Sequence, residues 1–532
     1  MSLIKVENLS LKINNNKILN DINFETNAGK ILGIIGESGS GKSMTANSIV
    51  QLLPKGSEIS GRILLENQDL LRFNENQMCK IRGAQIGFIF QEPMTALNPL
   101  KNIGDQVAEG IALHYNYDHS KSLKLASETL DRVGLPQKQF SLSRFPFELS
   151  GGQRQRVVIA MAIATKPQLL IADEPSTALD VTTQSKLLKL LKRLVIEDKI
   201  GLLMITHDLA VIAEMADDII IMKNGNIVEC GATSILAKGL KNPYSKSLFD
   251  ASNYRPKINQ IQKSEKPLLV INNITKEYEI KQKGFFSKKK HFKAVKNVSF
   301  QIFEGENVGL VGESGCGKST LTRAILGLDH VNDGTVVLDG DIIVYGQVKR
   351  NSRKKLQVVF QDPYGSFNPR HQVKKIITEP LYLLDLKMNK SDIQDLVAEI
   401  LLSVGLKPED SDKFIHEFSG GQRQRIAIAR SLIIKPKLII LDEAVSALDV
   451  SVRAQILDLL SKLSKEYNLS YLFISHDLSL VKSITNRVFV MKDGEIVESG
   501  ETLEIFNQPK HEYTKSLISS TPNLNSAIKK LM

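Results

Sequence analysis

Two segments of this 532-residue chain have the residue types and spacing of a phosphate-binding loop. In the pattern G-x-x-x-x-G-K-[ST], glycines let backbone N–H groups turn toward phosphate oxygens, the lysine bridges the β- and γ-phosphates, and the last hydroxyl ligates Mg²⁺. An ordinary glycine-rich turn is the alternative, but each loop follows an apolar strand pattern and precedes a helical one. The predicted phosphate-binding residues are Gly36, Glu37, Ser38, Gly39, Ser40, Gly41, Lys42 and Ser43 in the first loop, and Gly312, Glu313, Ser314, Gly315, Cys316, Gly317, Lys318, Ser319 and Thr320 in the second.

Carboxylates and an imidazole at the ends of short apolar strands could act on water near such a phosphate. The strand predicted at 169–172 ends at Asp173 and Glu174, and the strand predicted at 202–206 ends at His207. Two adjacent carboxylates in that position are unfavourable unless a cation or a polar ligand meets them. We therefore predict that Asp173 serves Mg²⁺, that Glu174 polarises the attacking water, and that His207 reaches a γ-phosphate. The second copy supplies Asp442, Glu443 and His476.

A glutamine and an eight-letter signature also occur twice. Gln91 follows the apolar letters 87–90, and Gln361 follows 358–360. LSGGQRQR at 149–156 returns as FSGGQRQR at 418–425, in each case where a helix is predicted to begin. Taken alone, the serine would be an ordinary helix N-cap, but a helix N-terminus beside a P-loop also suits a phosphate. The signature residues are Ser150, Gly151, Gly152 and Gln153, and Ser419, Gly420, Gly421 and Gln422.

One constant shift relates the later motifs of the two copies. Ser419 lies 269 positions after Ser150 (419 minus 150), and His476 lies 269 after His207 (476 minus 207). The two P-loop lysines are 276 apart (318 minus 42), so the differences in length between the copies fall early, before the signature. The sequence is therefore two copies of one domain.

The elements around these motifs predict an α/β fold in each copy. Strands are expected at 4–9, 18–24 and 30–35, and a helix from Met44 to Leu53, before Pro54. Residues 61–91 are strand-rich, and 92–148 form a separate helical lobe. We expect a first domain at 1–250, a polar linker at 251–266 and a second domain at 267–532.

Composition is that of an ordinary globular protein, with 42% apolar and 24% charged residues. No apolar run reaches about 18 residues and the N-terminus lacks a signal-peptide pattern, so a cytosolic chain is expected. Three scattered cysteines argue against a disulfide framework or a cysteine-rich metal site. The net charge of +11 indicates a generally basic, solvated surface, although a nucleic acid or anionic membrane would also fit it. One lysine cluster at 281–293 is either a membrane-contacting segment or an exposed hairpin loop.

The ordered set of P-loop, glutamine, SGGQ, apolar-DE and histidine resembles the ATP-binding cassette family along both halves. The letters QEPMTALNP after Phe90, QDPYGSFNPR after Phe360, and the Pro-Tyr-Ser and Glu-Tyr-Thr tails are similar to the ATPase subunits of oligopeptide and dipeptide importers, here fused in tandem. This resemblance implies two P-loop NTPase domains, each with a RecA-like α/β core, an antiparallel β subdomain and an α-helical subdomain.

The family also implies partners, cofactors and roles. ATP and Mg²⁺ would be bound, with the metal served by Ser43, Gln91 and Asp173 and by Ser319, Gln361 and Asp442. The halves would pair head to tail, so that 36–43 faces 419–422 and 312–319 faces 150–153. The glutamines would report the γ-phosphate to helical lobes that grip two integral membrane permease subunits on the cytoplasmic face of the inner membrane. An extracytoplasmic solute-binding protein would act indirectly, and no nucleic acid is expected.

Four positions depart from symmetry. The family stacks an aromatic residue on adenine where the second copy has Tyr278 and the first has Ile13, so weaker adenine binding is predicted in the first site. The second copy has Ala444 where Pro175 follows the acid in the first, and Phe418 in place of Leu149. Neither change removes a catalytic group, so two hydrolytic sites are predicted. Cys316 lies beside Lys318 and a helix N-terminus, which can lower a thiol pKa, although a small residue fitting a tight loop is the simpler interpretation.

A soluble tandem cassette protein acting on ribosomes or DNA is the competing interpretation. Such proteins carry a long charged linker or a large insertion, whereas the predicted linker here has about sixteen residues (251 to 266). The sequence favours the peptide importer and leaves the solute open: a dipeptide, a longer peptide, glutathione, a peptide antibiotic or nickel.

Overall fold

The computed structural model describes residues 2–177, 179–237, 239–254, 256, 266–280, 290–344, 346–362, 365–384, 388–446 and 448–531. The predicted linker and the lysine cluster fall largely outside these residues. Of the cluster, Lys293 lies on a strand and its Nζ is 3.2 Å from a carboxylate oxygen of Glu277.

The first half is built on a six-stranded sheet in the order β10-β9-β3-β8-β7-β6. Strands β9, β3, β8, β7 and β6 are parallel, and β10 is antiparallel to β9. The central strands are apolar and buried throughout, as parallel strands covered on both faces must be. The strands are β3 (Ile31–Ile35), β6 (Ile86–Ile89), β7 (Leu169–Asp173), β8 (Gly201–Ile205), β9 (Asp218–Lys223) and β10 (Asn226–Ala232).

A smaller antiparallel sheet packs beside this core, in the order β2-β1-β4-β5. Its strands are β1 (Ile4–Ile13), β2 (Asn16–Thr26), β4 (Ser57–Leu65) and β5 (Gln68–Asp69). The helices of the first half are α1 (Lys42–Ile49), α2 (Glu75–Ile81), α3 (Pro93–Ala96), α4 (Ile103–Tyr115), α5 (His119–Arg132), α6 (Gly151–Ile163), α7 (Val181–Asp198), α8 (Leu209–Met215), α9 (Thr233–Leu236) and α10 (Pro243–Ser252). Helices α4 and α5 form the lobe expected between 92 and 148 and pack on the signature helix α6.

The second half repeats this plan. Its sheets have the orders β16-β17-β18-β13-β19-β20 and β12-β11-β14-β15. The strands are β11 (Pro267–Ile280), β12 (Lys290–Phe303), β13 (Asn307–Val311), β14 (Asp333–Leu338), β15 (Asp341–Ile343), β16 (Leu356–Val359), β17 (Leu438–Asp442), β18 (Ser470–Ser475), β19 (Arg487–Lys492) and β20 (Glu495–Glu501). The helices are α11 (Lys318–Ile325), α12 (Arg350–Lys355), α13 (Val373–Thr378), α14 (Lys390–Ser403), α15 (Gly420–Leu432), α16 (Val450–Tyr467), α17 (Leu478–Ile484), α18 (Thr502–Asn507), α19 (Glu512–Ser519) and α20 (Leu524–Leu531). The predicted α/β fold with an antiparallel β subdomain and a helical subdomain in each half is confirmed.

Sequence patterns place most elements within a few residues, but the helix expected at Met44–Leu53 is shifted. It begins at Lys42, because Gly41 adopts a left-handed φ of 102° and turns the P-loop directly into the helix. It ends before Gln51, whose own φ is positive at 52°. The P-loop lysine therefore belongs to the first helical turn.

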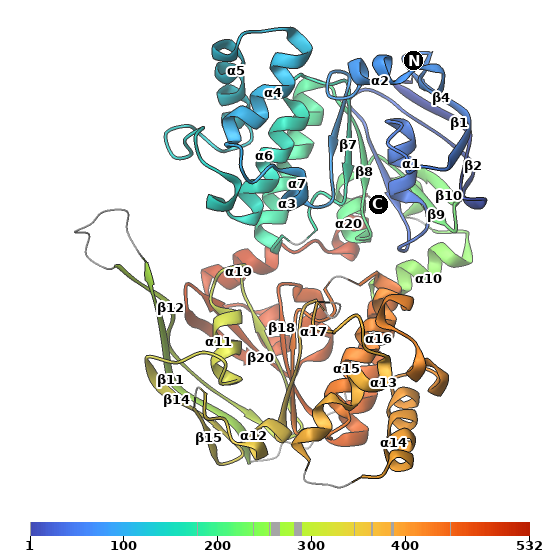
Figure 1. Ribbon diagram of the computed structural model, residues 1–532. Coiled ribbons are helices and arrows are strands. Elements are labelled where there is room, and N and C mark those ends of the chain that lie inside the picture. Colours follow the sequence, from blue (N-terminus) through green and yellow to red (C-terminus); the bar gives the residue numbers. More distant parts are fainter. Residues whose placement is uncertain are drawn as a thin grey trace.

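The two halves lie in opposite orientations. In Figure 1 the first half has its α4–α5 lobe on the left and its small sheet on the right. The second half has its small sheet on the left and its α13–α14 lobe on the right. Tail helices cross the junction, since α10 of the first half contacts α16 and α20 of the second contacts α8. Leu524 and Ala527 of α20 are buried in the apolar core of the first half. No helix within the described ranges is long and apolar enough to cross a membrane.

Candidate active sites

The P-loop lysines are buried and hydrogen-bonded to their own loops. Lys42 follows β3, and its Nζ donates to the carbonyl oxygens of Gly36 and Glu37, both at 2.8 Å. Lys318 Nζ makes the same bonds at 2.8 and 2.9 Å. Burial lowers the pKa of Lys42, against the pull of nearby carboxylates. The ammonium is thus held over the loop, where phosphate oxygens could replace the carbonyl oxygens as acceptors of its N–H groups.

A glycine is required where each loop leaves its strand. A Cβ on Gly36 would lie 2.3 Å from the carbonyl oxygen of Met222, and one on Gly312 would lie 2.2 Å from that of Met491. Neither backbone oxygen can move away, because each belongs to the neighbouring strand. The loop therefore passes closely over the end of the sheet, where the carboxylates also emerge.

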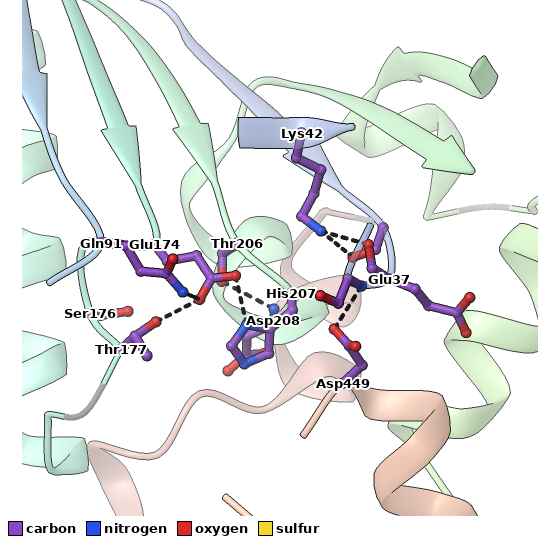
Figure 2. A network of polar contacts seen from close by, with 12 residues as sticks. Glu37, Lys42, Gln91, Glu174, Ser176, Thr177, Thr206, His207, Asp208 and Asp449 are labelled. Carbon is purple, nitrogen blue, oxygen red and sulfur yellow. Dashed lines mark hydrogen bonds and ion pairs between the residues drawn. The ribbon is translucent and has the colours of Figure 1, made fainter. Parts of the chain in front are cut away.

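Three side chains surround the Glu174 carboxylate (Figure 2). Gln91 Nε2 donates at 3.1 Å and Thr177 Oγ1 at 2.9 Å to Oε2, and His207 Nδ1 lies 3.2 Å from Oε1. Burial alone would raise the pKa of Glu174, but the bonds from His207 and Thr177 together with Lys42 lower it. At His207, burial acts to lower the pKa, but the hydrogen bond with Glu174 and the charge of that carboxylate outweigh it, so the pKa of His207 is raised. The glutamate is therefore held ionised and able to accept a proton or orient a water.

The second half repeats this arrangement with one hydrogen bond fewer. Glu443 accepts from Gln361 Nε2 at 2.9 Å and lies 3.2 Å from His476 Nδ1. Ser446 occupies the position of Thr177, but its hydroxyl donates to the backbone oxygen of Glu443 at 2.8 Å. Burial would raise the pKa of Glu443, and His476 lowers it overall. The two candidate bases thus share the contacts with a glutamine and a histidine, but only the Glu174 carboxylate also accepts a hydrogen bond from a neighbouring hydroxyl.

The neighbouring aspartates are suited to a cation. Asp173 Oδ1 is buried and has no hydrogen-bond partner among the described residues. Burial raises its pKa, and the hydroxyl of Ser43 opposes that rise through a hydrogen bond. Burial and the charge of Glu443 raise the pKa of Asp442 to about 6. Asp173 and the P-loop hydroxyl of Ser43 would hold a divalent cation, and its charge would offset the effect of burial by stabilising the ionised carboxylate.

The signature serines are helix N-caps, as the simpler interpretation stated. Ser150 Oγ accepts from the backbone N–H of Gln153 at 3.3 Å, and Gln153 Oε1 accepts from the N–H of Ser150 at 2.9 Å. Ser419 and Gln422 form the same capping box. The adjoining glycines are partly or fully exposed. Capping leaves the first amides of each helix available, so the local structure is compatible with both interpretations.

Each P-loop also contacts residues of the opposite half that the sequence analysis did not single out. The N–H of Ser38 donates to Asp449 at 3.0 Å, and Thr182 Oγ1 donates to Glu313 at 2.6 Å. Figure 2 shows Asp449 reaching toward the first P-loop beside Glu37. A signal was present, because the letters Ala-Leu-Asp at 178–180 recur at 447–449 with the shift of 269 (449 minus 180).

Two of the predicted asymmetries can be placed. Tyr278 lies on β11 and is 40% exposed; its hydroxyl donates to Asp329 at 3.2 Å, and Phe292 of β12 lies opposite it. Ile13, its counterpart, packs partly against the core of the first half. Burial raises the pKa of the Cys316 thiol more than Lys318 lowers it. Burial of Cys316 therefore favours the interpretation of a small residue fitting a tight loop over a thiol of lowered pKa.

The comparisons with known proteins decide the family. The family model "ABC transporter" matches residues 19–177 and 295–446, more than half of the chain. The chain belongs to the ABC transporter family. It is thus an ATP-binding, ATP-hydrolysing subunit of the kind expected from its motifs. A second model, "Oligopeptide/dipeptide transporter, C-terminal region", matches 497–532 of this ABC ATPase.

Relatives of this ABC ATPase match it along most of its length. It is 41% identical to the glutathione import ATP-binding protein GsiA of Salmonella typhimurium over 94% of this chain and 86% of that one. It is 40% identical to GsiA of Escherichia coli K12 over 98% of this chain and 90% of the relative. Among solved structures, the ADP- and Pi-bound dimer of an ATP-binding cassette aligns with 28% identity and a TM-score of 0.39, covering 44% of this chain and 98% of that one.

Proposed function

We propose that this ABC ATPase binds two ATP molecules between its halves and uses their hydrolysis to drive import of a peptide or a peptide-like solute. The observation that carries the proposal is the double set of P-loop lysine, ionised glutamate and paired histidine, joined to a tail of the oligopeptide/dipeptide type. Among the solutes left open by the sequence, the GsiA relatives favour glutathione, itself a small peptide, as one to test.

The chain's own residues supply positioning and charge neutralisation, which are what phosphoryl transfer to water chiefly needs. In the first site Lys42 neutralises phosphate charge. The ionised Glu174 orients and polarises the attacking water. His207 steadies Glu174 and reaches the γ-phosphate. Glu443, His476 and Lys318 have these roles in the second site.

Magnesium fits the buried oxygen of Asp173 together with the hydroxyl of Ser43. By the repeat of the sequence, Asp442 and Ser319 would hold it in the second site. When bound, it supplies neutralisation of the β- and γ-phosphate charge. The amide nitrogens of Gln91 and Gln361 donate to the proposed catalytic glutamates. We therefore assign each glutamine a role in sensing the γ-phosphate, and it would contact the metal only after leaving its glutamate.

We place one ATP between 36–43 and 419–422, and the other between 312–319 and 150–153. The opposed orientation of the halves and the contacts of both P-loops across the junction support this crossing. Ser150→Arg tests it, because the larger side chain should block the nucleotide of Lys318 and leave that of Lys42. Labelling with a photoreactive ATP analogue followed by peptide mapping reports each P-loop separately. Loss of labelling at the first P-loop instead would overturn the crossing.

Two integral membrane permease subunits and an extracytoplasmic solute-binding protein would complete the importer, with this chain on the cytoplasmic face. Expression of the affinity-tagged chain in its own cells should copurify two multi-span membrane proteins. A deletion strain should lose uptake of labelled dipeptide, oligopeptide or glutathione, and Glu174→Gln with Glu443→Gln should fail to restore it. Unchanged uptake of all three classes would refute peptide import while leaving the ATPase assignment intact.

A further inference from the structure

A tyrosine hydroxyl from each tail contacts the P-loop of its own half. Tyr244, at the start of α10, accepts a hydrogen bond from the backbone N–H of Glu37 at 3.3 Å. Tyr513, at the start of α19, accepts from the N–H of Glu313 at 3.0 Å. The two contacts are made by equivalent residues, 269 positions apart (513 minus 244), so the same geometry occurs twice in one molecule.

Each tyrosine is itself held in a built setting. Before α10, the carboxylate of Glu229 accepts the N–H groups of Lys241 and Asn242 at 2.7 and 3.3 Å. Lys223 Nζ lies 4.5 Å from the centre of the Tyr244 ring.

The second tail has the same setting. Glu498 accepts the N–H groups of Lys510 and His511 at 2.7 and 3.1 Å, and Lys492 Nζ lies 5.1 Å from the Tyr513 ring. The tyrosine hydroxyls are thus fixed relative to the last strands of each sheet, independently of the P-loops.

The P-loop glutamates that the tyrosines hold extend across the junction. Thr182 Oγ1, at the start of α7, lies 2.6 Å from a carboxylate oxygen of Glu313 and 2.7 Å from Oδ1 of Asp180 in its own half, so these two acceptors share its one proton. Ser451 Oγ, at the start of α16, donates to the Glu37 carboxylate. A continuous path therefore runs from the tail of each half, through its P-loop glutamate, to the opposite half. Burial, helped by the Glu37 carboxylate, raises the pKa of Tyr244 to about 12, so its hydroxyl remains protonated and can both accept and donate.

We propose that Tyr244 and Tyr513 are positioning residues, which fix Glu37 and Glu313 as hydrogen-bond acceptors for the opposite half and so make the importer-type tails part of the closed ATP sites. The proposal rests on the proposed pairing of the two halves about ATP. Without the hydroxyl, the glutamate backbone N–H loses its partner and the carboxylate is free to leave Ser451 or Thr182. Loss of the hydroxyl should therefore disfavour closure of the two halves and leave nucleotide binding by the open P-loop unchanged.

The test compares Tyr513→Phe with the unchanged full-length chain, because phenylalanine keeps the ring and removes only the hydroxyl. We expect kcat for ATP hydrolysis to fall roughly fivefold, as for loss of one hydrogen bond, while the Kd for Mg-ADP, which needs no closure, stays within about twofold. A tail with a merely structural role predicts a lower melting temperature with an unchanged kcat. Tyr115→Phe is the matched control, since that hydroxyl donates to the Thr165 carbonyl at 2.6 Å, away from either P-loop.

A double-mutant cycle separates action through the glutamate from a general effect. If Tyr513 acts through Glu313 on Thr182, then Tyr513→Phe combined with Thr182→Val should reduce kcat no further than the worse single change. Effects that multiply would overturn the proposal. Tyr244→Phe with Ser451→Ala is the second arm and decides the matter if Tyr513→Phe fails to fold.

The outcomes also distinguish this proposal from the proposed function. No ATP hydrolysis by the unchanged chain, alone or with its copurified membrane partners, would refute the paired ATPase. An active chain in which both phenylalanine variants keep full kcat would refute only the positioning role of the tyrosines.

Discussion

The unequal support of the two candidate bases gives a quantitative prediction. Thr177 Oγ1 donates to the Glu174 carboxylate, whereas the equivalent Ser446 donates to a backbone oxygen of Glu443. Thr177→Val removes the hydroxyl and nearly keeps the shape of the side chain. A hydrogen bond to a charged group contributes about 1.5–3 kcal/mol, and we take about 1 kcal/mol because two other groups still contact this carboxylate. That is about a fivefold change in the ratio of ionised to protonated Glu174.

The sign follows from which form the bond favours. Thr177 stabilises the ionised carboxylate, so its loss raises the pKa of Glu174 and leaves less of the base at low pH. The acid limb of the hydrolysis profile should move to higher pH, with little loss of rate above it. The assay is steady-state ATPase activity at saturating Mg-ATP in a Glu443→Gln background, where only the first site reports.

The second half provides the control. Ser446→Ala in a Glu174→Gln background removes a hydroxyl that does not contact the carboxylate, so its acid limb should not move. An unmoved limb in Thr177→Val, or an equal movement in Ser446→Ala, would refute the assignment of the glutamates as ionised bases supported by their neighbours.

Three further predictions concern stability and reactivity. Leu524→Asp places a charge in the core of the first half and should release α20. A loss of about 2–5 kcal/mol of stability should lower the melting temperature by several degrees in calorimetry. The change Asn525→Asp at an exposed position should leave the melting temperature unchanged, and equal melting of the two variants would argue against the crossing tail. Hydrogen bonds from Lys355 and other lysines lower the pKa of Asp339. The contribution of Asp339 to folding stability is therefore complete above the usual range of aspartate pKa values and is lost as pH falls through the lowered pKa. Asp339→Asn should therefore reduce thermal stability at neutral pH, by about 1 kcal/mol, with the difference closing in acid. Because burial raises its pKa, Cys316 should react with a thiol reagent more slowly than the two exposed cysteines, and an equal rate would contradict the buried site.

Much of the fold and of each site's inventory could be read from local pattern. Apolar runs such as 169–172 are buried on both faces in the structure, and glycine spacing at 36–43 is dictated by backbone conformation and by close approach to a neighbouring strand. These constraints act over a few residues, so the sequence expresses them directly. Internal repetition added the rest, because weak signals such as Gln91 became interpretable once Gln361 was found at the end of the equivalent strand of the second copy.

Boundaries and long-range contacts were harder to predict. The first P-loop helix was expected two residues too late, because the left-handed turn at Gly41 gives no apolar signal. Thr177 and Ser446 look interchangeable as letters, yet their hydroxyls donate to different acceptors. Such choices depend on rotamers and neighbours, which a pattern of residue types does not record.

The sequence by itself determined the duplicated α/β fold and the groups that we propose to face phosphate, because both follow from short-range periodicity, glycine conformation and the chemistry of side chains at strand ends. Only the tertiary structure decided that the halves oppose each other, that α20 crosses to the first half, and that Tyr244 and Tyr513 reach the P-loops. Those contacts join residues about two hundred positions apart, such as 37 with 244 and 313 with 513, and depend on how completed elements pack.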